Sequence, residues 1–274
     1  MSVNTTPTSG LGDAEHLAVL GYEGTYHRSM SLWGNIALGF TYLSPLVAVY
    51  SLFAFSLSIG GPPSIFWIVI VGAGQLLVAL VMGEVVSQFP IAGGIYPWSR
   101  RLWGKRYAWM AAWIYVWAMI VTITAVAEFG TGFVSSLLGV PVTPVTTLLF
   151  AVGLLLLALA LNLGGTKVMS RVARIGLAAE LTGVVALGLY LLIFQRKNDI
   201  SVLFDSFGKG DGNYLPAFVG AALVGLFMFY GFEACGDVAE EVNDPSRRVP
   251  RAMYLTIFVG GVSALMSYAG YVLA

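Results

Sequence analysis

Four carboxylic acids lie inside otherwise apolar stretches of this sequence: Glu84, Glu128, Glu180 and Glu233. An ionisable side chain is costly in hydrocarbon, so each is by default a candidate for holding a cation or taking up a proton. The alternative for each is a hydrogen bond to a neighbouring helix. We favour this structural role for Glu84, near the cytoplasmic end of its stretch, while Glu128 lies far enough out to reach the membrane interface. Glu180 lies well inside its stretch.

Two of the apolar stretches contain residues that interrupt a helix. Pro45 removes a backbone donor and clashes with the carbonyl four residues earlier, that of Thr41. The other stretch places Gly231 and Glu233 inside an apolar run. Unpaired amides and carbonyls survive at membrane depth only where they face protein or a wet cavity. The two breaks therefore predict a binding site near the midplane, and the alternative is a proline kink plus a glycine packing contact.

The stretches that carry these residues are long enough to cross a membrane. Of the 274 residues, 58% are hydrophobic and 10% are charged, whereas a soluble domain has about 25% charged residues. A spanning helix needs about 20 apolar residues. Seven stretches have that length, namely 31–58, 63–89, 107–137, 144–163, 167–194, 215–240 and 250–274. The sequence thus predicts an all-α polytopic membrane protein in a lipid bilayer.

The cationic residues predict how these spans are oriented. If the spans alternate, eleven of the fourteen lysines and arginines fall on one face, and such an excess marks the cytoplasmic side. The N-terminus is then inside, and we expect a multi-pass protein of the cell membrane. Residues 1–30 are polar and lack the order of a secretory signal. We interpret them as a disordered cytoplasmic tail.

Several other functional classes receive no support from the residue types present. The net charge is zero, so no basic field indicates binding to nucleic acid. Cys235 is the only cysteine, and His16 and His27 both lie in the tail, so we expect no metal site. HExxH and GxSxG patterns are absent from the sequence, and we expect no enzyme. A transporter is the favoured interpretation, with a membrane channel as the alternative.

Three segments resemble the amino acid–polyamine–organocation superfamily, and its amino acid/choline transporter branch in particular. Residues 83–96, GEVVSQFPIAGGIY, are similar to the family motif at the end of the second helix. Residues 230–234, YGFEA, followed by 240–252, EEVNDPSRRVPRA, resemble the motif that leads from the sixth helix to the seventh. A shorter match lies at the start of the first helix. The resemblance implies the first seven helices of a LeuT-like 5+5 inverted-repeat fold, with helices 1 and 6 unwound.

By this resemblance a substrate is held between the two breaks. Amides around Leu46–Ala48 would meet a carboxylate or another polar end, and carbonyls near Phe229–Gly231 would accept an ammonium group that aromatic rings surround. On the third helix, two residues three apart share one face and are further candidates to line the pocket. The expected substrate-contacting residues are Ser44, Pro45, Leu46, Val47, Ala48, Met119, Thr122, Phe229, Tyr230, Gly231, Phe232 and Glu233.

The resemblance also implies roles in coupling and gating. Glu180 is the candidate for coupling to a proton or a sodium ion, with a structural partner on an adjacent helix as the alternative. Glu233 either contacts the substrate amine or fixes the unwound backbone. We expect no cofactor beyond the coupling ion, H⁺ or Na⁺. The expected cytoplasmic gate and motif residues are Glu84, Pro90, Gly93, Gly94, Tyr96, Glu240, Glu241, Pro245, Pro250 and Arg251.

The function implied is secondary active transport of amino acids or related amines, such as GABA, choline or polyamines, by symport or exchange. In the first helix, Ser44–Ala48 stands where the family has glycines, so this break comes from proline. The chain also stops inside its seventh predicted helix, whereas the family core has ten. We therefore expect a truncated fragment that does not transport alone. The choice of substrate and the oligomeric state are left open.

Overall fold

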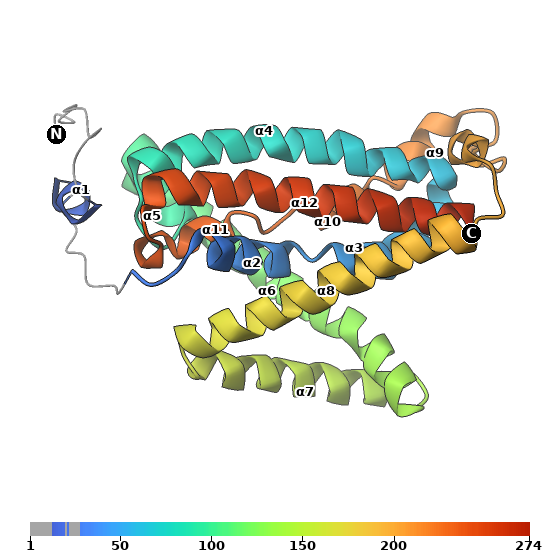
Figure 1. Ribbon diagram of the computed structural model, residues 1–274, viewed down its shortest axis with the longest axis horizontal. Coiled ribbons are helices and arrows are strands. Elements are labelled where there is room, and N and C mark those ends of the chain that lie inside the picture. Colours follow the sequence, from blue (N-terminus) through green and yellow to red (C-terminus); the bar gives the residue numbers. More distant parts are fainter. Residues whose placement is uncertain (1–12, 20, 22–27) are drawn as a thin grey trace.

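The computed structural model describes residues 13–19, 21 and 28–274. In this part of the chain every regular element is a helix (Figure 1). The α-helices are α1 (Asp13–Val19), α2 (Leu32–Leu43), α3 (Pro45–Gly60), α4 (Phe66–Gln88), α5 (Ile95–Trp103), α6 (Lys105–Leu138), α7 (Pro144–Leu163), α8 (Thr166–Phe194), α9 (Tyr214–Gly220), α10 (Leu223–Met228), α11 (Ala234–Asp237) and α12 (Pro245–Leu273). Three short 3₁₀ turns, η1 (Pro62–Ile65), η2 (Ile200–Phe204) and η3 (Ala239–Glu241), complete the described elements.

Within the described residues, six helical stretches are long and apolar enough to cross a membrane. They are Leu32–Gly60, Pro62–Gln88, Lys105–Leu138, Pro144–Leu163, Val168–Phe194 and Pro245–Leu273. The prediction of an all-α polytopic membrane protein is therefore confirmed. The predicted span 215–240 is not one helix, because it is divided among α9, α10 and α11. Its longest continuous apolar piece is Tyr214–Met228.

The packed core lies around α12, which contacts α4, α8 and α2 (Figure 1). Tyr268 of α12 is fully buried, and its hydroxyl lies 2.7 Å from that of Ser56 on α3. By contrast, none of the side chains of α7 is buried. Leucines such as Leu156 and Leu159 are more than half exposed, which suits a helix whose surroundings are lipid rather than water.

The two interrupted spans lie beside each other. The half-helix α11 packs against α2, and α9 and α10 pack against α3. The amides of Ser29 and Met30 donate to the carbonyl of Glu241 at 3.1 and 2.9 Å, and the amide of Asn243 donates to the carbonyl of Met30 at 3.1 Å. These bonds tie the segment before α2 to the segment after α11, so the two spans are held together at this end.

Some boundaries differ from the predicted ones. Helix α5 lies between the second and third predicted spans, and it buries Trp98 while it exposes Arg100. Helix α12 begins at Pro245 rather than at 250, because Pro245 takes the first position and Pro250 is accommodated inside the helix. Helix α1 lies within the segment that was predicted to be a disordered tail. The rest of that prediction falls largely outside the described residues.

Candidate functional site

The first span is interrupted at a serine and a proline. Helix α2 ends at Leu43, Ser44 has a left-handed backbone with φ 42°, and α3 begins at Pro45. Proline has no amide hydrogen and a fixed φ, so it suits the first position of a helix but cannot continue α2. The first amides of α3 therefore lack partners within their own helix.

A carboxylic acid from α8 occupies this break. Oε1 of Glu180 accepts a hydrogen bond from the hydroxyl of Ser44 and another from the amide of Leu46, each at 2.9 Å. The exposed amides and the dipole of a helix N-terminus stabilise an anionic group at this position. Because Pro45 has no amide, Glu180 takes the first donor that α3 offers.

The second interruption separates α10 from α11. Gly231 has φ 89°, and a Cβ at this position would collide with the ring of Tyr42. Glycine is therefore required both by the backbone conformation and by the close approach of α2. The carboxylate of Glu233 accepts a hydrogen bond from the hydroxyl of Tyr115 at 3.3 Å. Each break thus contains one carboxylic acid, which binds the freed backbone in the first break and Tyr115 of α6 in the second.

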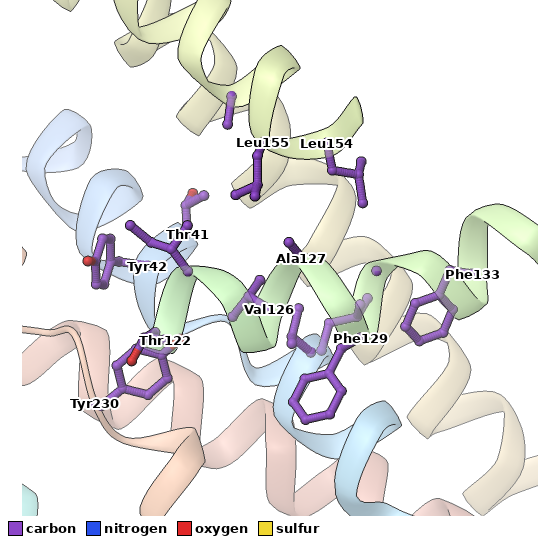
Figure 2. A pocket seen from close by; sticks show the side chains of 15 residues that line it. Thr41, Tyr42, Thr122, Val126, Ala127, Phe129, Phe133, Leu154, Leu155 and Tyr230 are labelled. Carbon is purple, nitrogen blue, oxygen red and sulfur yellow. The ribbon is translucent and has the colours of Figure 1, made fainter. Parts of the chain in front are cut away.

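The two breaks border one cavity of about 450 Å³. Its polar end is formed by Thr41, Tyr42, Thr122 and Tyr230 (Figure 2), whereas apolar side chains of α3, α6 and α7 form the rest. The rings of Tyr42 and Tyr230 meet edge to face with their centroids 6.3 Å apart. The complete lining is Thr41, Tyr42, Leu46, Val47, Thr122, Ile123, Val126, Ala127, Phe129, Gly130, Phe133, Leu154, Leu155, Ala158 and Tyr230. The arrangement can enclose a small solute that has one polar end and an apolar body.

The structure brings part of the predicted substrate-contacting set to this cavity. The predicted residues in its lining are Leu46, Val47, Thr122 and Tyr230. Phe229 and Phe232 lie in the core instead, with 1% and 3% of their surface exposed. The ring of Phe229 packs against Gly72 of α4 and Gly261 of α12, so it fills space between these helices.

The remaining members of the set lie in the walls around the breaks. Pro45 and Ala48 are buried, and Pro45 packs beside Gly260 of α12. Ser44, Gly231 and Glu233 form the interrupted backbone and its hydrogen bonds, and none of them lines the cavity.

Three polar residues of the site were not identified from the sequence. Thr41 and Tyr42 line the cavity from the end of α2, and Tyr115 donates to Glu233 from α6. The hydroxyl of Tyr42 also donates to the sulfur of Met119 at 2.9 Å. A signal was available on α6, because positions 115, 119 and 122 are four and three residues apart and so share one helix face.

The predicted cytoplasmic motif residues form a clamp between the loop before α5 and the second broken span. The amide of Ala92 donates to Oε1 of Glu240 at 3.0 Å, and the amide of Gly93 donates to the carbonyl of Asp237 at 3.1 Å. Gly94 has φ 55°, and a Cβ there would collide with the carboxylate of Asp237. The same segments border a second cavity of about 570 Å³, lined by Ile91, Ala92, Gly93, Tyr96, Pro97, Asp237, Glu240 and Glu241.

The other motif residues surround this clamp. Pro90 and Pro245 are buried, whereas Arg251 is exposed. Pro250 packs against Gly83 of α4. Glu84 is exposed and accepts a hydrogen bond from Gln88, one turn further along α4, at 2.8 Å.

Comparison with known proteins agrees with this architecture. The profile of a family described as amino acid permeases matches residues 30–273. The chain is 28% identical to the amino-acid permease BAT1 homolog of Oryza sativa, over 96% of this chain and 54% of that protein. It is 24% identical to the low-affinity putrescine importer PlaP of Escherichia coli, over 86% of this chain and 51% of that protein.

A further relative is the L-asparagine permease of Escherichia coli, which is 28% identical over 97% of this chain and 55% of that protein. The chain spans about half the length of the curated relatives that it matches. The family profile covers nearly every residue from the start of the first span to the end of α12. The chain is a multi-pass membrane protein that belongs to the amino acid permease family.

Proposed function

We propose that this chain forms the substrate site of a secondary transporter that carries amino acids or related amines across the cell membrane by alternating access. The observation that carries the proposal is that two interrupted spans meet at one cavity, which is lined by Tyr42 at the end of α2, by Leu46 and Val47 at the start of α3, and by Tyr230 after α10. Freed backbone groups at membrane depth are the usual means by which such transporters bind small polar solutes. The permeases and the importer among the relatives support the same class.

Alternating access needs a closure that can open on one side, and the clamp around Gly93 and Gly94 suits this role. It joins the loop before α5 to Asp237 and Glu240 through two hydrogen bonds to backbone amides. The cations of α5 and the start of α12 lie near the same end, which favours a cytoplasmic location for the clamp and for the N-terminus. Release to the cytoplasm would then require these bonds to break.

We propose the proton as the coupling ion and Glu180 as the group that carries it, with Na⁺ as the alternative. Glu180 accepts hydrogen bonds from Ser44 and Leu46, on both sides of the first break. Adding or removing a proton there changes the strength of both bonds, because charged acceptors bind about twice as strongly as neutral ones. Protonation would therefore be linked to the relative position of α2 and α3.

The proposal is tested with the purified protein in lipid nanodiscs and in proteoliposomes. We expect this chain in nanodiscs to bind labelled amines or amino acids saturably. A permease of the full family length that contains this chain should take them up into proteoliposomes when a pH gradient is imposed. Tyr230→Ala should weaken binding, whereas the matched variant Tyr107→Ala should not, because Tyr107 is 54% exposed at the start of α6. Absence of binding and of uptake across a broad panel of both ligand classes, in folded protein, would refute the proposal. Binding to this chain without uptake by the longer permease would support a ligand site at the cavity but refute its role in transport.

A further inference from the structure

The first break has few free hydrogen-bond donors for the carboxylate of an amino acid substrate. A helix N-terminus binds an anion through its unpaired amides. Here Pro45 has none, the amide of Leu46 donates to Glu180 at 2.9 Å, and the amide of Ala48 already donates to the carbonyl of Ser44 at 3.3 Å. Only the amide of Val47 is left, and a carboxylate that approached it would meet the carboxylic acid of Glu180 at the same helix end.

The second break presents acceptors rather than donors. The carboxylate of Glu233 accepts a hydrogen bond from the hydroxyl of Tyr115. In the part of the chain that the structure describes, no backbone amide donates to the carbonyls of Phe227, Met228 or Phe229, which follow or end α10. Carbonyl oxygens at a helix C-terminus carry partial negative charge and favour a cation.

The side chains that line the cavity between the breaks also favour a cation over an anion. None of its fifteen lining residues is Lys, Arg or His. The hydroxyl of Thr41 already donates to the carbonyls of Ala37 and Ala173. A substrate carboxylate would thus be buried without a charged partner, whereas an ammonium group would meet the ring of Tyr230 in the cavity lining.

The body of the cavity is apolar on the side away from the breaks. Phe133, Leu154 and Leu155 form that side, opposite Tyr42 and Tyr230 (Figure 2). A second ammonium group placed among these side chains would lose its hydration without gaining a partner. The cavity therefore suits a solute with one cationic end and an apolar body.

We infer that the substrate is a primary monoamine with an apolar body and without a carboxylate, and that Glu180 fills the position that the carboxylate of an amino acid would take. The inference rests on the proposed function and narrows its substrate class. It distinguishes the site of this chain from a site for amino acids and from a site for diamines, the two substrate classes that the names of the relatives indicate.

Matched pairs of ligands test this inference on the unmodified protein. Each pair is an amino acid and the amine that lacks its carboxylate, namely leucine and isoamylamine, phenylalanine and phenethylamine, and ornithine and putrescine. Competition binding in nanodiscs should give the two monoamines dissociation constants at least about tenfold lower than those of their amino acids, and lower than that of putrescine. An amino acid that binds as tightly as its amine, or putrescine as the tightest ligand, would overturn the inference while leaving the proposed function intact. If no ligand of either class binds, the proposed function itself fails.

Leucine methyl ester separates charge from size, because it keeps the substituent at the α-carbon and removes its negative charge. The ester should bind more like isoamylamine than like leucine, and an ester as weak as leucine would contradict the role given to charge. Glu180→Gln should lower the preference for isoamylamine over leucine at least about fivefold, since it removes the competing carboxylate from the start of α3. Glu128→Gln is the matched control, because Glu128 is exposed on α6 and should leave the preference unchanged.

Discussion

Replacement of Gly231 by alanine perturbs the second break at a single atom. The backbone there has φ 89°, and a Cβ would collide with the ring of Tyr42. A left-handed conformation costs a residue with a Cβ about 1–2 kcal/mol. Forcing a ring out of a packed position costs about 1–3 kcal/mol more. Gly231→Ala should therefore lower the free energy of unfolding by roughly 2–5 kcal/mol, and it should weaken ligand binding because Tyr42 lines the cavity.

The two contributions can be separated by measuring unfolding in mixed micelles for single and double variants. Tyr42→Ala removes the collision but not the backbone strain. The double variant should therefore be about 1–3 kcal/mol more stable than the sum of the two single-variant effects predicts. Gly74→Ala is the control, since Gly74 lies within α4 and a Cβ there would meet nothing within 4 Å. It should be neutral or stabilising by up to about 1 kcal/mol. A Gly231→Ala protein as stable as Gly74→Ala would refute the described geometry of the break.

Three other predictions concern single side chains. Tyr230→Ala and Glu233→Gln should each weaken substrate binding about tenfold or more while expression changes less, because Tyr230 lines the cavity and Glu233 binds Tyr115 at the second break. Unchanged binding in both variants would place the site elsewhere. Glu180→Gln should flatten the pH dependence of uptake, and an unaltered pH profile would remove Glu180 from coupling. Tyr268→Phe should cost about 1 kcal/mol in unfolding experiments through the lost bond to Ser56; an unchanged unfolding free energy would show that this bond adds nothing.

The interruptions were predictable because their causes are local. Pro45 cannot donate to the preceding turn, and glycine in an apolar run marks a place where a helix can end. The membrane spans were predictable for a similar reason, since length and composition alone define them. The division of the sixth predicted span among α9, α10 and α11 depends on packing against α3 and α4, which no local pattern reports.

The roles of the four carboxylic acids could not be separated from the sequence. Glu84 and Glu128 are exposed, whereas Glu180 binds the backbone of the first break and Glu233 binds Tyr115 at the second. The partner of Glu180 is Ser44, 136 residues away along the chain, and only the crossing of α8 over the first span brings them together. The direction of the Phe229 side chain was unpredictable for a related reason. It follows the end of α10, where helical periodicity no longer tells which way a side chain points.

The central claim, that a substrate occupies the cavity between the two breaks, is tested most directly by protection of an introduced thiol. Thr122→Cys places a reactive group in the lining, and the native Cys235 is fully buried and should stay silent. Saturating isoamylamine should slow labelling of the introduced thiol by a methanethiosulfonate reagent about tenfold, with half-protection at the dissociation constant of the amine. Labelling at the same rate with and without a bound amine would contradict the account.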